Sequence, residues 1–269
     1  MRARVAAQRP DLLAAVTAAV GEDPFPRVEE STRFAQPAIL CASLAAWSTL
    51  RPQADLLAGH SLGEIGALAA AGALTETDAL RLVAERGRLM DEAGRAAGGD
   101  GSMLALLGRG AADAAPAIAA ATGLAIANDN SPQQVVLSGS RSAFAAATEQ
   151  AEEHKLRALE LPVAGAFHSP MMESAVPELR RVLDELDVRE PEITVVSAVT
   201  AAPIEDVRAT LAEGVVKPVR WRETLQALHA LGARRFVEIG PGKVLTGLVR
   251  RTLADVEAAA AEQPEVAHA

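Results

Sequence analysis

The chain has 269 residues, 49% hydrophobic and 23% charged, which is typical of a globular protein with one sizeable core or a core with an insertion. Its formal net charge of -9 argues against nucleic-acid binding, because duplex binders present a basic face. The single cysteine, Cys41, excludes an internal disulfide and a cysteine-based metal site. Since the sequence lacks a signal-like N-terminus and a long uncharged apolar segment, we expect no membrane span and a cytoplasmic location.

The first part of the chain alternates helix and strand patterns around one glycine-rich turn. Apolar residues at helical spacing indicate the helices, and a short apolar run before the turn indicates a strand. Thr32 and Thr77 are the expected caps of two helices. The expected elements are helices over 11–20 and 35–50, a strand over 54–58, a helix from the turn to about Ala71, and a helix over 75–90.

A glycine-rich polar stretch at 94–101 marks a boundary, and the segment after it has its own order of elements. That order is β-α-β-β-α-β, which is typical of a ferredoxin-like unit. We therefore expect an inserted subdomain at 102–164 and a core made of residues 1–101 and 165–269. The expected elements are a strand over 102–108, a helix over 111–122, strands over 124–128 and 134–139, a helix over 142–154 and a strand over 156–163.

Longer α/β alternation returns beyond the insertion, as in an α/β core. The Ala- and Glu-rich tail at 256–269 is expected to fray. The expected elements are a helix over 171–186, a strand over 194–199, a helix over 204–214, a helix after Trp221, a strand over 235–239 and a last helix to about Leu253.

The turn Gly59-His-Ser-Leu-Gly63 fits the G-x-S-x-G nucleophile elbow, between a strand and a helix as that motif requires. Flanking glycines relieve crowding in the sharp turn, so the Ser61 hydroxyl stands clear of the backbone. The helix that begins there directs free N–H groups, Leu62 N–H among them, at an oxyanion formed nearby. The alternative is a glycine-rich turn that contains serine by chance.

A nucleophilic serine needs a base, and His168 is the most suitable of five histidines. It lies in the irregular segment Ala164-Gly-Ala-Phe-His168-Ser-Pro, and loops of this kind carry functional residues. The alternative is a loop histidine that is satisfied by its neighbours. The others fit less well: His60 lies in the elbow, His154 and His229 lie on expected helices, and His268 lies in the tail.

Seven short stretches between residues 36 and 250 carry a family resemblance. They are Gln36-Pro-Ala38, Gly59-His-Ser-Leu-Gly-Glu64, Arg81-Leu-Val-x-x-Arg86-Gly87, Asn128-x-Asn130-Ser-Pro-x-Gln134-Val-Val, Gly165-Ala-Phe-His168-Ser, Lys217-Pro-Val-x-Trp221 and Glu238-Ile-Gly-Pro-Gly-Lys243-Val-Leu-x-Gly247. In this order they resemble the malonyl-CoA:acyl carrier protein transacylase family, which is related to polyketide synthase acyltransferase domains.

The resemblance implies an α/β-hydrolase-like core with an inserted ferredoxin-like subdomain. It implies Ser61 as the acylated nucleophile, His168 as the general base and Arg86 as the partner of the substrate's free carboxylate. A guanidinium fork suits that task because it grips a carboxylate with two hydrogen bonds. A surface helix arginine is the alternative for Arg86. Phe167 implies malonyl rather than methylmalonyl, since its ring leaves little room for a further methyl group.

Two further site residues follow from the resemblance. Asn130 is a secondary site residue in its matching stretch. The backbone carbonyl that orients His168 falls at Gly214, where the family often has Gln or Asn. Because a backbone acceptor survives a change of side chain, the Ser–His pair remains workable.

The implied reaction transfers malonyl from malonyl-CoA to the phosphopantetheine thiol of acyl carrier protein through a malonyl-serine, in fatty acid biosynthesis. No metal or cofactor is implied, and the expected partners are malonyl-CoA and acyl carrier protein, with no nucleic acid or membrane and a monomeric protein. Carrier proteins are acidic, so arginines such as Arg109, Arg141 and Arg250 are candidates for docking.

Members of the family begin with a strand and a Gly-Gln-Gly-Ser-Gln loop, whose first Gln supplies a second oxyanion donor. This sequence shows neither segment. We expect Met1 to be an internal methionine of a longer natural protein, and an in-frame stop codon directly upstream of it would contradict that. The loss of one oxyanion donor costs about 10²–10³ in rate.

Three other functions stay open at this stage. The first is a serine thioesterase or hydrolase, which would use a late histidine such as His229 and gain nothing from Arg86. The second is a discrete acyltransferase of a polyketide pathway. The third is an inactive or truncated form that binds carrier protein without turnover.

Overall fold

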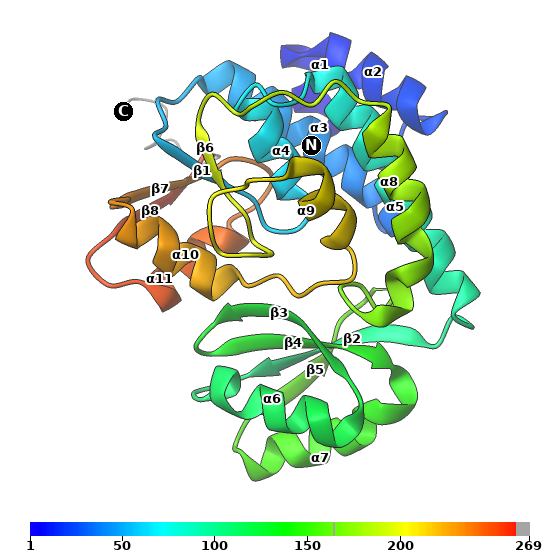
Figure 1. Cartoon of the computed structure of the whole chain (residues 1–269), viewed down its shortest axis with the longest axis vertical. Helices are drawn as coiled ribbons and strands as arrows, with labels where there is room; N and C mark the ends of the chain where they lie inside the picture. Colours follow the sequence, from blue (N-terminus) through cyan, green and yellow to red (C-terminus); the bar gives the residue numbers. More distant parts are fainter. Residues whose placement is uncertain (164, 262–269) are drawn as a thin grey trace.

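The computed structural model describes residues 1–163 and 165–261. Figure 1 shows a larger body above and a smaller unit below it, joined where the chain leaves and re-enters the body. Within the described ranges, no helix combines the length and apolarity needed to cross a bilayer.

Helices form most of the larger body, and α3 and α5 make its most extensive helix–helix contact. Gly87 allows this contact, because a Cβ on it would lie 2.9 Å from the backbone oxygen of Thr32. Buried aliphatic side chains from these helices, Leu40 and Leu80 among them, build the main core. The helices are α1 (Arg2–Gln8), α2 (Pro10–Val20), α3 (Thr32–Leu50), α4 (Gly63–Ala70), α5 (Glu76–Ala96), α8 (Val176–Asp184), α9 (Val207–Glu213), α10 (Trp221–Ala230) and α11 (Val244–Thr252).

The strands of the body are short and form two parallel pairs. β1 (Leu56–Ala58) pairs with β6 (Thr194–Val196), and β7 (Arg235–Glu238) pairs with β8 (Glu257–Ala260). Among the described residues, β1 and β7 are each hydrogen-bonded to one strand only. Side chains of both pairs pack on a common cluster around Trp221.

The smaller unit is a four-stranded antiparallel sheet in the order β3-β4-β2-β5, with two helices on one face (Figure 1). Its own core contains Leu106, Ile118 and Leu137, which are fully buried. The elements are β2 (Gly101–Leu107), α6 (Ala111–Thr122), β3 (Ala125–Ser131), β4 (Gln134–Ser140), α7 (Phe144–Glu153) and β5 (Arg157–Glu160).

The edge strand β3 joins this unit to the body. Val219 N–H donates to Ala127 O at 2.8 Å, and Asp129 N–H donates to Val219 O at 2.9 Å. Arg222, on α10, holds the Asp129 carboxylate with two nitrogens, at 2.7 to 3.1 Å. The smaller unit is therefore fixed to the body by backbone hydrogen bonds and by a bidentate ion pair.

Several elements differ from expectation. The tail at 257–260 forms β8 instead of fraying, because it pairs in parallel with β7; residues 262–269 lie outside the described residues. The helix expected over 171–186 is a 3-10 turn at Pro170–Ala175 followed by α8, and helix α1 was not expected at all.

Two helix caps also differ. The cap of α3 is Ser31, whose hydroxyl accepts from Arg33 N–H, rather than Thr32. The cap of α5 is Thr75, whose hydroxyl accepts from Asp78 N–H, rather than Thr77. In each case the cap is one or two positions earlier along the chain than the periodicity suggested.

Candidate active site

The elbow between β1 and α4 places Ser61 in a left-handed conformation, with φ of 52°. A Cβ on Gly59 would lie 1.9 Å from the carbonyl carbon of Gly63. The first glycine of the motif is therefore required sterically, because the turn folds the chain back onto itself. Strain of this kind at a non-glycine residue is typical of functional sites.

The hydroxyl of Ser61 lies 2.8 Å from Nε2 of His168, although 107 positions separate the two residues. His168 also has a left-handed backbone, with φ of 57°, and its N–H donates to Val215 O at 3.1 Å. The loop thus presents the imidazole edge to the elbow.

The partners of the His168 ring determine its tautomer. Nδ1 lies 2.8 Å from the carbonyl oxygen of Gly214 and 3.0 Å from that of Lys217. Because carbonyl oxygens only accept, Nδ1 carries the hydrogen and donates it, which leaves Nε2 with a lone pair for the Ser61 hydroxyl. Gly214 thus lies where the sequence placed the orienting carbonyl.

The surroundings of His168 keep its ring neutral. Burial, the positive charge of Arg86 and the nearby His60 lower the pKa of His168 to about 3, while the carbonyls of Gly214 and Lys217 act in the opposite direction. A neutral ring with a free Nε2 is the form that can accept a proton from serine.

Arg86, on α5, reaches the same oxygen from another side. Its Nη2 donates to Ser61 Oγ at 2.9 Å, and its Nη1 donates to the side-chain oxygen of Gln36. Burial lowers the pKa of Arg86 to about 10, and the negative charge of Glu64 opposes that shift. The guanidinium is therefore a buried cation next to the nucleophile.

Leu62 lies at the start of α4. The N–H group that follows it, that of Gly63, donates to a carbonyl oxygen of the elbow, His60 O, at 3.0 Å. The N–H of Leu62 has no hydrogen bond among the described backbone groups. It is therefore available to an oxyanion on a carbonyl attacked by Ser61.

Asn130 contacts the elbow through His60. Its Oδ1 lies 2.7 Å from His60 Nε2, and the His60 ring meets Trp221 edge-on, with centroids 5.4 Å apart. Burial lowers the pKa of His60. This contact joins β3 of the smaller unit to the residue before the nucleophile.

Phe167 is partly buried and packs on the clusters of both the body and the smaller unit. A Cβ on Gly165 would lie 2.6 Å from the Phe167 ring, so the ring occupies the space that a side chain at 165 would need. Phe167 therefore lies next to the base, between the two parts of the molecule.

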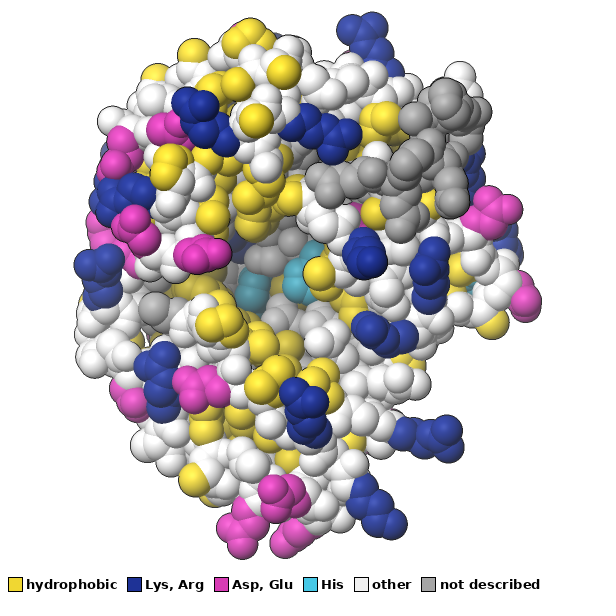
Figure 2. All heavy atoms as spheres, turned by 180° about the vertical axis from the view of Figure 1, so that it is seen from behind, with side chains coloured by type: hydrophobic (Ala, Val, Ile, Leu, Met, Phe, Trp, Pro, Cys, Tyr) yellow, Lys and Arg dark blue, Asp and Glu magenta, His cyan; other side chains and the backbone are white. Residues whose placement is uncertain are grey.

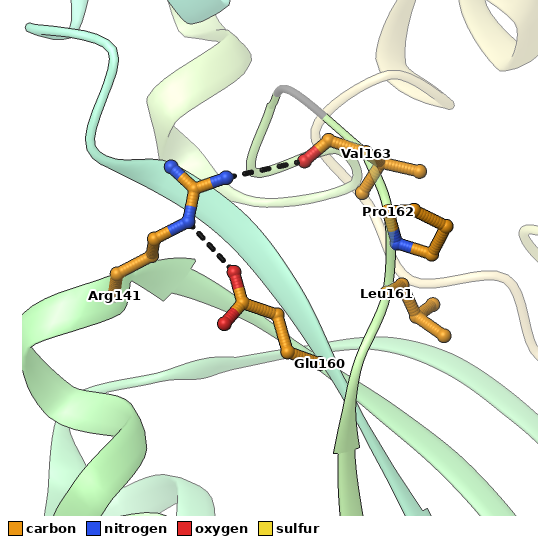
Figure 3. Close-up of a pocket in the computed structure, with 5 residues that line it drawn as sticks. All are labelled: Arg141, Glu160, Leu161, Pro162 and Val163. Carbon is orange, nitrogen blue, oxygen red and sulfur yellow. Dashed lines mark hydrogen bonds and ion pairs between the residues drawn. The ribbon is translucent and has the colours of Figure 1, made fainter. Parts of the chain in front are cut away.

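Seen from behind, the molecule has a hollow in the middle of its face, with histidine side chains at the bottom (Figure 2). A separate open cavity of about 470 Å³ lies where β5 leaves the smaller unit (Figure 3). There Arg141 donates to Glu160 at 2.7 Å and to Val163 O at 3.5 Å, so its guanidinium is already engaged. No cluster of metal-ligating side chains occurs among the described residues.

The sequence did not single out Gln36 and Glu64 as site residues. Both lie within stretches that carry the resemblance. Gln36 contacts Arg86 across 50 positions of sequence, and Glu64 lies in the first turn of α4, directly after the elbow. Glu64 is 3% exposed, and burial raises its pKa to about 7. Of the other histidines, His229 lies on α10, and His268 is outside the described residues.

A family model described as acyl transferase domain matches residues 14–267. The chain belongs to the acyltransferase family. The malonyl CoA-acyl carrier protein transacylase of Bacillus subtilis is 39% identical over 245 residues, which is 87% of this chain and 77% of that protein. The Salmonella typhimurium protein of the same name is 36% identical, over 98% of this chain and 92% of its own length. The polyketide biosynthesis protein ThaF of Burkholderia thailandensis is 40% identical over 86% of this chain, but this is only 20% of ThaF.

Solved structures show the same relationship. The malonyl-CoA:acyl carrier protein transacylase of Xanthomonas oryzae superposes with a TM-score of 0.89 at 35% identity, covering 98% of this chain and 90% of that one. An acyl-carrier-protein S-malonyltransferase of Burkholderia pseudomallei gives 0.88 at 34% identity, over 96% and 89%. This acyltransferase therefore has the expected fold, an α/β-hydrolase-like core with a ferredoxin-like subdomain.

Proposed function

We propose that this acyltransferase moves a malonyl group from malonyl-CoA to the phosphopantetheine thiol of an acyl carrier protein, in fatty acid biosynthesis. One observation carries the proposal: the Ser61 hydroxyl oxygen lies within hydrogen-bonding distance of both a neutral imidazole, at 2.8 Å, and a buried guanidinium, at 2.9 Å. A nucleophile with a base on one side and a cation on the other suits an acyl donor that carries a carboxylate. The names of the relatives agree with this donor.

In the first half-reaction, Ser61 Oγ attacks the thioester carbon while His168 Nε2 takes the hydroxyl proton. The carbonyl oxygen gains negative charge and accepts from Leu62 N–H. As the C–S bond breaks, His168 returns its proton to the sulfur, and CoA leaves with a free thiol. The product is a malonyl ester on Ser61.

In the second half-reaction the carrier thiol gives its proton to His168 and attacks the ester carbon. The C–O bond to Ser61 breaks, the serine oxygen regains the proton, and malonyl leaves on the carrier. Gly214 O and Lys217 O stabilise the imidazolium that forms in each half, since both face Nδ1–H.

Arg86 holds the malonyl carboxylate in this scheme, and the Phe167 ring limits the space around the acyl group. Asn130 supports the elbow through His60. In this proposal the protein acts as a cytoplasmic monomer without metal or cofactor. Its subdomain comprises residues 102–164, and its core comprises residues 1–101 and 165–269. Residues 164 and 262–269 are outside the described ranges.

Intact-mass spectrometry after exposure to malonyl-CoA tests the proposal. We expect a gain of about 86 Da, one malonyl group, on the wild type and none on Ser61→Ala. Adding a phosphopantetheinylated carrier protein must discharge the adduct to the carrier faster than water does. Discharge mainly to water would instead favour a thioesterase, and an absence of adduct would favour an inactive protein.

A further inference from the structure

Arg86 is buried to 6% exposure, yet its two observed partners are both uncharged: the Gln36 amide and the Ser61 hydroxyl. Among the described residues, no carboxylate lies within ion-pair distance of it, and Glu64 acts on it only through its charge. A buried guanidinium without a paired anion is unfavourable, so Arg86 has an unmet charge that an anionic ligand can neutralise.

The contacts of Gln36 fix which end of its amide faces Arg86. Its Nε2 donates to Thr32 Oγ1 at 2.7 Å and lies 3.4 Å from the sulfur of Met90. Its Oε1 accepts from Arg86, as it must, because a guanidinium has donors only. Gln36 is 4% exposed, so water does not compete for either end.

Close packing of two helices makes this contact possible. Gln36 lies on α3 and Arg86 on α5, and Gly87 brings α5 against the backbone of Thr32 and Arg33. A glycine within a helix costs about 1 kcal/mol relative to alanine. Here it lets α3 approach closely enough for the amide to reach the guanidinium.

We propose that Gln36 is the positioning residue that makes the site selective for a carboxylated acyl group, an inference that rests on the proposed function. Its neutral oxygen aims Arg86 at Ser61 without neutralising the guanidinium. The positive charge therefore stays available for the carboxylate of the acyl donor. A glutamate at this position would hold Arg86 equally well but would supply the anion from within the protein.

Selectivity between malonyl-CoA and acetyl-CoA tests this, because the two donors differ in one carboxylate. We expect Gln36→Glu to lower the malonyl-to-acetyl ratio of kcat/KM by about 100-fold, since the donor must displace an internal carboxylate from Arg86. The loss should lie mainly in KM for malonyl-CoA. Gln36→Met, which is neutral and similar in length, should lower the ratio by only about tenfold, because Arg86 is then unheld but still charged.

The outcomes separate this inference from the proposed function. A wild type without malonyl preference contradicts both. If the wild type prefers malonyl-CoA, and Gln36→Glu has the same malonyl-to-acetyl ratio and an unchanged Tm, the role of Gln36 is overturned. The proposed malonyl transfer is then unaffected. If Gln36→Glu does not fold, Gln36→Met decides, since an unchanged malonyl-to-acetyl ratio in that variant overturns the inference as well.

Discussion

The ferredoxin-like subdomain and the α/β core differ in how their sheets are held together. The subdomain sheet is continuous, and its central strand β2 pairs along its full length with β4. The core strands have three or four residues each and form two separate parallel pairs. The subdomain comes from one contiguous segment, whereas segments distant in sequence meet in the core.

The proposed reacting groups lie in the core, the region with the shorter and separate strand pairs. Ser61, Arg86 and His168 all come from the core, on a turn, a helix and a loop, while the subdomain contributes Asn130 through His60. The regular sheet of the subdomain thus supports the elbow from one side, whereas a turn, a helix and a loop that meet through long-range contacts carry the three side chains of the core.

Removing the base should produce the largest effect. We expect His168→Ala to lower kcat/KM for malonyl transfer by about 10³-fold, because in the proposed mechanism Nε2, which lies 2.8 Å from Ser61 Oγ, accepts the serine proton. Steady-state kinetics with malonyl-CoA measure this. Near-normal activity with an unchanged Tm would mean that another group acts as the base.

A cavity in the subdomain should affect stability more than chemistry. Ile118 is fully buried in the subdomain core, so Ile118→Ala should lower the free energy of unfolding by about 3 kcal/mol. Hydrogen exchange should rise in β2 to β5 before it rises around Ser61. An equal increase of hydrogen exchange in both regions would show that the subdomain and the core unfold as one unit.

Arg86→Gln should change both affinity and pH dependence. We expect kcat/KM for malonyl-CoA to be about 100-fold lower, because the variant lacks the guanidinium that binds the carboxylate of the donor. Burial is the largest cause of the low pKa of His168, and the Arg86 charge lowers it further. Removing that charge therefore raises the pKa, and protonation then inactivates the base at higher pH than in the wild type.

The acid limb of acetyl transfer measures this shift without a substrate carboxylate. The wild-type rate should stay level well below pH 6.5, the ordinary pKa of histidine, and the variant should begin to lose activity at a higher pH than the wild type. If the acid limbs of the wild-type and variant pH–rate profiles coincide, Arg86 does not affect the pKa of His168.

The smallest effect should follow from loosening the junction between the regions. Arg222→Ala removes a partly exposed bidentate ion pair with Asp129. We expect this variant to lower the free energy of unfolding by about 1 kcal/mol. Arg181→Ala, which breaks exposed ion pairs with Glu178 and Glu185, is the control and should cost less. Hydrogen exchange in β3 should increase only in the first variant, and the same increase in both would deny the ion pair a specific role.

Local patterns predicted much of this molecule. The helix at 111–122 has the expected bounds, and the β-α-β-β-α-β order is as expected, because each element there is marked by its own local run of apolar residues and by the turn residues around it. The elbow was also recognisable, since a strand, a glycine-flanked serine and a helix are consecutive. Fold class, family and enzyme class followed from the combined motifs.

Long-range contacts limited the rest. β8 is an Ala-rich segment that becomes a strand only because β7 lies beside it. The contact of Gln36 with Arg86 depends on a close helix pair, and the ion pair of Asp129 with Arg222 joins residues 93 positions apart. Periodicity and propensity report neighbours along the chain, so they carry no signal for such pairings.

Residues 217–219 belong to both regions at once. Lys217 O accepts from the imidazole of His168, and two positions later Val219 exchanges backbone hydrogen bonds with β3. Both contacts lie within three residues, so a shift of the subdomain is transmitted to Lys217 O, an acceptor of the His168 ring. The position of the subdomain and the orientation of the His168 ring are therefore coupled through one short backbone segment.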